Sequence, residues 1–252
     1  FQPIIPWEMV CSNPRDTTSW LLKDYAISNH LAIAPDVLLK TAVPQLKNSR
    51  MLIVAPRLND SLLDLSVARQ TAVSLSKVFH SRLFDGYVDT NSFLRQLSLF
   101  GIIQVFSHGA GAKGVFLSDG LLKAEQVQHL ELNAELVALT TCEGWEGDLR
   151  QNEGIMGMVN AFSRAGAKRQ IASLWKIDER TSALIMALFY EEIQKGNAAD
   201  EALRLAKLRY LETAHPSERD PRFWAGLVLF GEPDGFRMDE RTDNRRWLIF
   251  PI

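Results

Sequence analysis

The stretch GIIQVFSHGAGAKGVF (Gly101–Phe116) decides how the rest of the chain is interpreted. Its first seven residues form an apolar run that is typical of a short buried strand. His108 follows, and then three glycines with the spacing G-x-G-x-x-G, at Gly109, Gly111 and Gly114. A loop of this kind either cradles a nucleotide phosphate or positions a catalytic histidine, and the sequence that follows it must distinguish the two.

The residues after the loop do not favour a nucleotide site. A dinucleotide fingerprint needs a helix that begins within it, so that the helix N-terminus can meet the pyrophosphate. Here the sequence GVFLSDGLL follows, which predicts a β-hairpin with an Asp-Gly turn. HGAG is also similar to the oxyanion loop of lipases and esterases, but the chain contains no G-x-S-x-G nucleophile elbow. The interpretation of His108 as a catalytic residue remains.

Apolar runs alternate with helical patterns along most of the chain, which predicts an α/β fold. The expected strands are 25–28, 50–56, 81–88, 101–107, 134–141, 168–175 and 222–231, and the expected helices are 35–46, 60–79, 90–100, 123–132, 153–166, 179–196 and 198–214. We expect Thr90 to cap one of these helices and Gly166 to end another. Such an order implies a mostly parallel central sheet that is covered by helices on both faces.

Two of the expected strands end at reactive residues. His108 follows IIQVFS and Cys142 follows LVALTT. Active sites of parallel sheets lie beyond the carboxyl ends of the strands, so adjacent strands would bring both side chains to one edge. A histidine can deprotonate a thiol and then protonate a leaving amine, while the N–H groups of Gly109 and Cys142 would form an oxyanion hole.

Other interpretations of these residue types stay open. A cysteine at the end of a buried strand is most often a small core residue. Cys11 lies in a proline-rich start and has no predicted chemistry. The remaining histidines are scattered singly, without a cysteine or carboxylate partner at metal-ligand spacing, so we expect no metal site.

Composition and charge limit the classes of function. The chain has 252 residues, of which 46% are hydrophobic and 23% are charged, and its net charge of −2 does not favour a nucleic-acid binder. It has no apolar run of 18 or more residues and no secretory signal, and its two cysteines favour a reducing, cytoplasmic setting. Because the sequence lacks an initiator methionine, we interpret it as a processed product or an excised fragment.

Several segments taken together resemble the CHAT family of caspase-like cysteine peptidases. The segments are VFSHG, LVALTTCEG, NEGIMGMVNAFSRAGAKRQIASLWKIDE, ALFYEEIQKGNAADEALRLAKLRYL and RFWAGLVLFGEP, with YAIS and MLIVAP before them. The resemblance covers residues 24–233, and its specificity comes from the order and number of the segments. It implies a caspase-like α/β/α sandwich that hydrolyses peptide bonds with a thiol.

The resemblance also implies roles for individual residues. The family's histidine-glycine pair corresponds to His108 and Gly109, and its nucleophile corresponds to Cys142. Related peptidases that cut after arginine or lysine often carry an acid two residues before the cysteine, but this chain has the neutral Thr140 there. We therefore expect an apolar or small residue at P1, the substrate position before the cleaved bond.

Four residues are expected to bind substrate at this edge: Thr140, Glu143, Trp175 and Asp178. Trp175 would wall the P1 pocket, or would simply be an aromatic side chain packed at a strand end. Asp178 would bind peptide or a cation. Glu143 would contact substrate, or would belong to a solvated charged loop.

The predicted organisation is an irregular extension (1–48) packed on a caspase-like domain (49–235), followed by a tail (236–252) that ends in the apolar WLIFPI. The predicted function is a regulated cysteine endopeptidase that needs no cofactor and acts on a protein substrate, without nucleic acid or membrane partners. Members of the family commonly lie beside tetratricopeptide repeats, and some act in cell-death or anti-phage systems, so a sensor or repeat partner is expected. The alternatives are a pseudo-protease that binds peptides for regulation and, more distantly, another thiol enzyme such as an acyltransferase.

Overall fold

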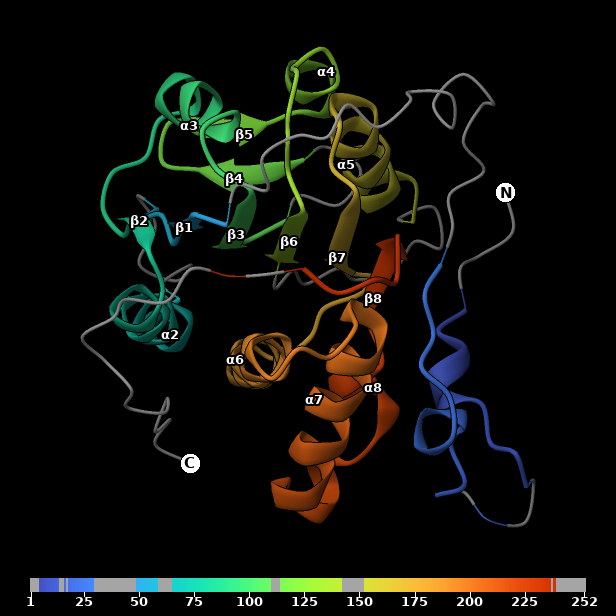
Figure 1. Cartoon of the computed structure of the whole chain (residues 1–252). Coiled ribbons are helices and arrows are strands. Elements are labelled where there is room, and N and C mark those ends of the chain that lie inside the picture. The colour runs from blue at the N-terminus through green and yellow to red at the C-terminus, as the bar shows by residue number, and fades with distance from the viewer. Residues whose placement is uncertain are drawn as a thin grey trace.

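The structure is a computed structural model that describes residues 5–13, 16, 18–29, 49–58, 65–109, 114–141, 152–236 and 238. The expected helix at 35–46, the start of the expected helix at 60–79 and the apolar end of the tail lie outside these residues. Figure 1 shows a central sheet between two layers of helices, with the first described residues beside one edge.

The central sheet has six strands in the order β2-β1-β3-β6-β7-β8. Their bounds are β1 Met51–Val54, β2 Ser81–Phe84, β3 Ile102–Ser107, β6 Leu136–Thr141, β7 Arg169–Ser173 and β8 Leu227–Gly231. The first five strands in this order are parallel to their neighbours, and β8 runs antiparallel to β7. The prediction of a mostly parallel sheet is confirmed.

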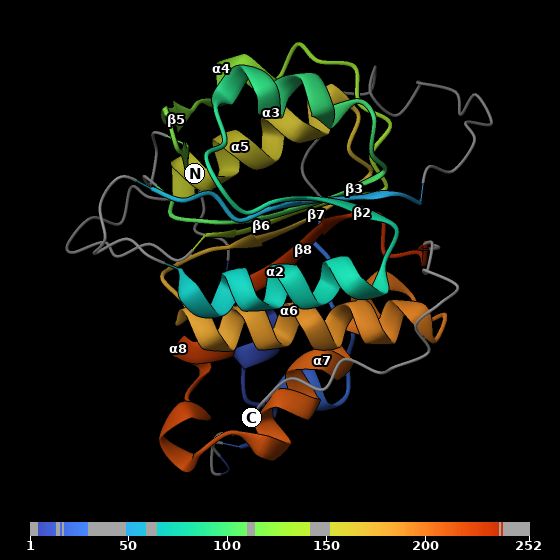
Figure 2. The same ribbon diagram turned by 90° about the vertical axis from the view of Figure 1, so that its left-hand side faces the viewer.

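Helices cover both faces of the sheet, as the continuous apolar strands require (Figure 2). One layer contains α2 (Ser66–Val78), α6 (Glu179–Gln194) and α7 (Ala199–Thr213), and the other contains α3 (Thr90–Leu97), α4 (Ala124–Val127) and α5 (Asn152–Ala165). Alternate residues of each strand enter different cores. In β3, Ile102 and Phe106 join the core beneath α2 and α6, whereas Ile103 and Val105 join the core beneath α3 and α5.

The predicted hairpin after the glycine loop is confirmed. It consists of β4 (Val115–Leu117) and β5 (Gly120–Leu122), which pair antiparallel. Gly114 enters β4 with φ +135°, and a Cβ at this position would lie 2.0 Å from the carbonyl oxygen of Leu122. The third glycine of the loop therefore allows the backbone of β5 to pass close to the start of β4. A strand, not a helix, follows this glycine, which agrees with the rejection of a nucleotide fingerprint.

One predicted element end is confirmed, and two others differ from the structure. Gly166 follows α5 with φ +111°, as expected for a helix-ending glycine. The cap of α3 is Asp89, whose carboxylate accepts a hydrogen bond from the Ser92 N–H; the prediction that Thr90 is the cap was wrong. The strand expected over 222–231 begins later, because the short helix α8 (Pro221–Trp224) precedes β8.

The first described residues of the chain, 5–13, 16 and 18–29, pack against α7 and β8 (Figure 1). They contain the short 3-10 helices η1 (Trp7–Met9) and η2 (Leu21–Lys23). The strand expected at 25–28 does not form; instead Asn29 makes an isolated parallel bridge to Phe230 of β8. The segment is anchored by an ion pair between Glu8 and Lys207, both of which are buried.

Candidate active site

The carboxyl ends of β3 and β6 lie side by side, and they define the candidate site. The two strands are parallel neighbours from Ile102↔Leu136 to Ser107↔Thr141. His108 is the residue directly after β3, and Cys142 directly follows β6 in the sequence. The structure therefore brings together the two strand ends that the sequence singled out.

The backbone around His108 is held by the hairpin. The carbonyl oxygen of His108 accepts a hydrogen bond from the Phe116 N–H at 2.9 Å, and Gly109 makes an isolated antiparallel bridge to Val115. The histidine is partly exposed, whereas Gly109 is buried. The hairpin thus fixes the position at which β3 ends and keeps the histidine side chain at the rim of the sheet.

Thr140 is turned into the protein. Its side chain is 1% exposed, and its hydroxyl accepts a hydrogen bond from Gln104 Nε2 at 2.8 Å and donates one to the carbonyl oxygen of Val105 at 3.1 Å. Tyr190 of α6 donates its hydroxyl to Gln104 Oε1 at 2.8 Å. Thr140 was expected to bind substrate, but its hydroxyl makes these internal contacts behind the strand end, and we leave it out of the proposed substrate contacts.

Trp175 lies just beyond β7, and its indole is held by a hydrogen bond and by close packing. Its Nε1–H donates to the carbonyl oxygen of Arg222 in α8 at 2.8 Å. The same part of the ring contacts Gly226 so closely that a Cβ there would lie 2.7 Å from Trp175 Cε2 and 2.9 Å from Nε1. The indole is partly buried and joins the apolar clusters on both faces of the sheet. Its orientation is therefore fixed by packing, which is compatible with either role considered for it.

The other expected site residues differ in what the structure says of them. Asp178 is exposed and is the N-cap of α6, where its carboxylate accepts a hydrogen bond from the Thr181 N–H at 3.1 Å. This contact gives Asp178 a role in starting the helix, whatever else it binds. Cys142 and Glu143 lie outside the described residues, so their expected roles stay predictions.

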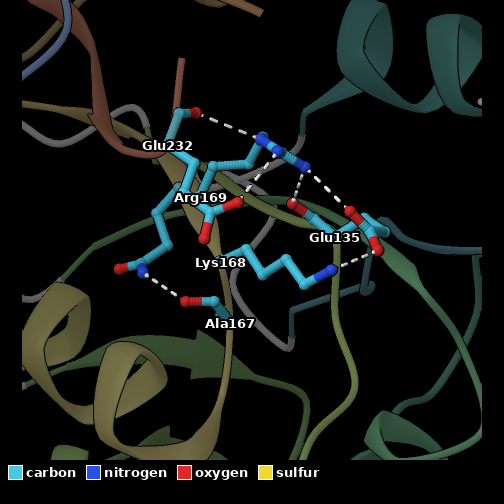
Figure 3. A network of polar contacts seen from close by, with 6 residues as sticks. Glu135, Ala167, Lys168, Arg169 and Glu232 are labelled. Atoms are coloured by element: carbon cyan, nitrogen blue, oxygen red, sulfur yellow. Dashed lines mark hydrogen bonds and ion pairs between the residues drawn. The ribbon is translucent and has the colours of Figure 1, made fainter. Parts of the chain in front are cut away.

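A second polar cluster lies at the opposite, amino-terminal edge of the sheet (Figure 3). Arg169, which is 2% exposed, binds the Glu135 carboxylate at 3.0 Å and the Glu232 carboxylate at 3.5 Å, and Lys168 binds Glu135 at 2.8 Å. Burial would raise the pKa of Glu135, but hydrogen bonds from Lys168 and Arg169 outweigh it and lower that pKa. The charges of this cluster pair with one another, as in a structural ion network that joins β6, β7 and the end of β8.

The described parts of the chain contain neither a candidate metal site nor a candidate membrane span. Within those residues, no three His, Cys, Asp or Glu side chains are grouped as metal ligands. Nor does any described helix combine the length and apolarity that crossing a membrane requires.

Reasoning from the sequence missed three residues that shape this edge. Gln104 is a lone polar residue in an apolar strand, and Tyr190 is a lone hydroxyl-bearing aromatic residue in an apolar helix face. Both are exceptions to their local pattern, and a buried polar residue normally has a partner, so their pairing was a detectable signal. Gly226 gave no comparable signal, because its role depends on Trp175, which is distant in the sequence.

Solved structures with a similar fold include separase and the cysteine proteinase gingipain R. Separase in the separase–securin complex of Saccharomyces cerevisiae aligns with 92% of this chain and 15% of its own, with a TM-score of 0.59 and 16% identity. Gingipain R, described as an Arg-specific cysteine proteinase, aligns with 75% of this chain and 47% of its own, with a TM-score of 0.51 and 13% identity. At these identities the likeness concerns the fold, which is caspase-like as predicted.

Curated relatives match a smaller part of the chain. Tetratricopeptide repeat protein 28 of Homo sapiens is 29% identical over 119 residues, and its counterpart from Mus musculus is 28% identical over 119 residues. Each match covers 46% of this chain but only 4% and 5% of the respective relative, so the chain spans a small fraction of their length. The family model of the CHAT domain matches residues 4–232, nearly the whole chain. This chain therefore belongs to the CHAT domain family, whose caspase-like fold it shares with cysteine peptidases.

Proposed function

We propose that the chain is a cysteine endopeptidase in which His108 and Cys142 form a catalytic dyad. The observation that carries the proposal is the register of β3 and β6, which pairs Ser107 with Thr141. Neighbouring strands are about 4.8 Å apart, so residues that continue both strands by one position would be within reach of each other. Phe106 and Thr140 are also paired, and side chains two residues further along each strand would point to the same face.

In this proposal the two residues divide the chemistry. His108 accepts the thiol proton, and the Cys142 thiolate attacks the carbonyl carbon of the scissile peptide bond. The N–H groups of Gly109 and Cys142 stabilise the oxyanion. His108 then donates the proton to the leaving amine, and water hydrolyses the acyl-enzyme without a cofactor.

Substrate contacts are proposed for Trp175, Asp178 and Glu143. Because Trp175 is fixed by Arg222 and Gly226, it would form a rigid wall for the P1 side chain. The position two residues before Cys142 carries a neutral, buried threonine, which supplies no charge for a basic P1 residue. We therefore propose an apolar or small P1 residue in a protein substrate.

The proposal includes control by a regulatory or repeat partner. The curated relatives are named for tetratricopeptide repeats, and this chain corresponds to a small part of each. We propose that such a repeat or sensor region acts on the 49–235 domain, that the apolar tail within 236–252 supplies a docking surface for it, and that the protein works in the cytoplasm. A role in cell death or bacterial defence is proposed on the family resemblance alone.

Active-site labelling tests the proposal. The folded chain is incubated with a library of peptide acyloxymethyl ketones, beside the variants Cys142→Ala and His108→Ala, and adducts are measured by intact mass. We expect one adduct on Cys142 that is lost in both variants, and the preferred peptide identifies P1. Strict preference for arginine would refute the proposed P1 residue.

The same experiment distinguishes the alternatives. Labelling that requires an added repeat partner would indicate a latent peptidase. Absence of labelling under both conditions would refute the peptidase and favour a peptide-binding pseudo-protease. Reaction with thioesters but not with peptides would indicate an acyltransferase.

A further inference from the structure

Three buried side chains connect β3, β6 and α6 near the carboxyl ends of the two strands. Gln104 is 0% exposed, Thr140 is 1% exposed and Tyr190 is 0% exposed. Polar side chains at such depth cost stability unless all their hydrogen-bonding groups are paired. Their arrangement is therefore a specific feature that the sequence maintains at the centre of an otherwise apolar sheet face.

The three side chains form one directed chain of hydrogen bonds. Tyr190 donates its hydroxyl to Gln104 Oε1 at 2.8 Å. Gln104 Nε2 donates to Thr140 Oγ1 at 2.8 Å and to the carbonyl oxygen of Val105 at 3.3 Å. Thr140 donates its hydroxyl to the same carbonyl at 3.1 Å. Burial raises the pKa of Tyr190 well above its ordinary value, so the tyrosine stays protonated and remains a donor at neutral pH.

The chain of hydrogen bonds fixes the register of the two strands near their ends. It joins Gln104 on β3 to Thr140 on β6, and Thr140 is paired with Phe106 in the ladder. A slip of one residue would move Thr140 to the opposite face and break its hydrogen bonds with Gln104 and with the Val105 carbonyl. His108 is two residues beyond Phe106, so any change in the strand ends moves the histidine as well.

We propose that Gln104, Thr140 and Tyr190 are positioning residues that set the separation and alignment of His108 and Cys142. The inference rests on the proposed function, since it concerns the same pair. It also assigns a role to α6, because Tyr190 carries the connection from the strands into the helix layer. A displacement of α6 would then reach the dyad through this tyrosine.

The test measures the dyad without requiring peptide cleavage. The rate at which iodoacetamide alkylates Cys142 is measured by mass spectrometry from pH 5 to 10, using the whole 252-residue chain. The midpoint of this profile reports the pKa of the thiol, which a nearby histidine lowers. His108→Ala gives the profile of the uncoupled thiol.

Thr140→Val and Tyr190→Phe each remove one hydroxyl from the network with little change of shape. We expect both profiles to move toward that of His108→Ala, and Thr140→Ser, which keeps the hydroxyl, to retain the parent profile. Where the parent cleaves a peptide, kcat should fall about tenfold to a hundredfold while KM changes less than about threefold. Tyr190→Phe keeps the ring and its packing, so it serves if Thr140→Val fails to fold.

Thr181→Val is the matched control. Thr181 is also buried and also lies beside a tyrosine, 3.3 Å from the Tyr210 hydroxyl, but this pair joins α6 to α7 and does not touch β3 or β6. The Thr181→Val variant should be less stable than the parent but should keep the parent's alkylation profile. A shift in this control as large as that of Thr140→Val would show a general effect of destabilisation and overturn the inference.

The remaining outcomes are distinct. If His108→Ala raises the midpoint but Thr140→Val and Tyr190→Phe match the parent, the positioning role is refuted and the dyad stands. If His108→Ala leaves the profile unchanged, the two residues are not coupled, and the proposed function fails together with this inference.

Discussion

The ion pair that anchors the first described segment allows a quantitative prediction about Lys207. This side chain is 0% exposed, and its ammonium donates to the Glu8 carboxylate and to the carbonyl oxygen of Leu227 at 2.6 Å. Burial lowers the pKa of Lys207 and raises the pKa of Glu8, while the attraction between them acts in the opposite direction on both. The net directions indicate that desolvation costs more than the pairing returns.

Replacing only one member of the Glu8–Lys207 pair should therefore lower the free energy of unfolding far more than replacing both. Lys207→Met leaves Glu8 buried without a counter-charge, and we expect a loss of about 3–5 kcal/mol in the free energy of unfolding. For a domain of this size that corresponds to a decrease in Tm of about 6–20 °C. The double variant Glu8→Leu/Lys207→Met should be within about 1 kcal/mol of the parent, or more stable, because no charge is buried.

Urea unfolding of the parent, both single variants and the double variant measures these differences. Hydrogen exchange at residues 5–29 shows whether the loss is local to the anchored segment. Arg222→Met is the control, since that side chain is 83% exposed and its ion pair with Asp220 should contribute less than about 1 kcal/mol. A loss below about 1 kcal/mol in Lys207→Met, or a double variant whose loss is the sum of the single losses, would refute the reasoning.

Three further predictions concern the sheet. The pKa of Glu135 is lowered in the folded state, so its contribution to stability is present above its ordinary pKa of about 4.5 and is lost as the pH falls through the folded value; a Tm series from pH 3 to 6 should show a smaller acid loss in Glu135→Gln. The buried Ser173 hydroxyl has no hydrogen-bond partner among the described residues, so Ser173→Ala should be neutral or should raise the free energy of unfolding by up to about 2 kcal/mol; a clear loss of stability would indicate a missed partner. Gly226→Ala places a methyl 2.7 Å from the Trp175 ring and should cost about 1–3 kcal/mol with a change in tryptophan fluorescence; unchanged fluorescence would mean that the ring is not held there.

Most of the architecture could be predicted because it depends on local patterns. A strand that is buried on both faces needs a continuous apolar run, and MLIV, IIQVFS and LVALTT are such runs that all formed strands. The glycine at 166 could be predicted for the same reason, since a positive φ after a helix favours one residue type. The observed cap, Asp89, is one residue before the predicted cap, Thr90. Aspartate and threonine both cap helices, so the sequence does not decide between them.

Contacts between distant segments could not be predicted in this way. Glu8 and Lys207 are 199 positions apart in the sequence, and neither residue type is expected to be buried. Where a strand was expected at 25–28, the described residues contain an isolated bridge at Asn29, which makes two backbone hydrogen bonds with the edge strand β8. Such features depend on which surfaces meet after the sheet has formed.

Thr140 shows why residue type and position do not establish a site contact. The sequence places it two residues before Cys142, where a substrate contact is a natural expectation, but alternation along β6 turns its side chain toward α6. There Gln104 offers an amide that needs an acceptor, and a threonine hydroxyl can accept from that amide while donating to the Val105 carbonyl. The β-branched side chain suits the strand, and its hydroxyl completes a network that an alanine or a valine would leave unsatisfied. The need for a hydroxyl at position 140 thus comes from its contacts with β3, which Tyr190 of α6 extends. The chemistry proposed at the strand ends depends on Thr140 only through these contacts.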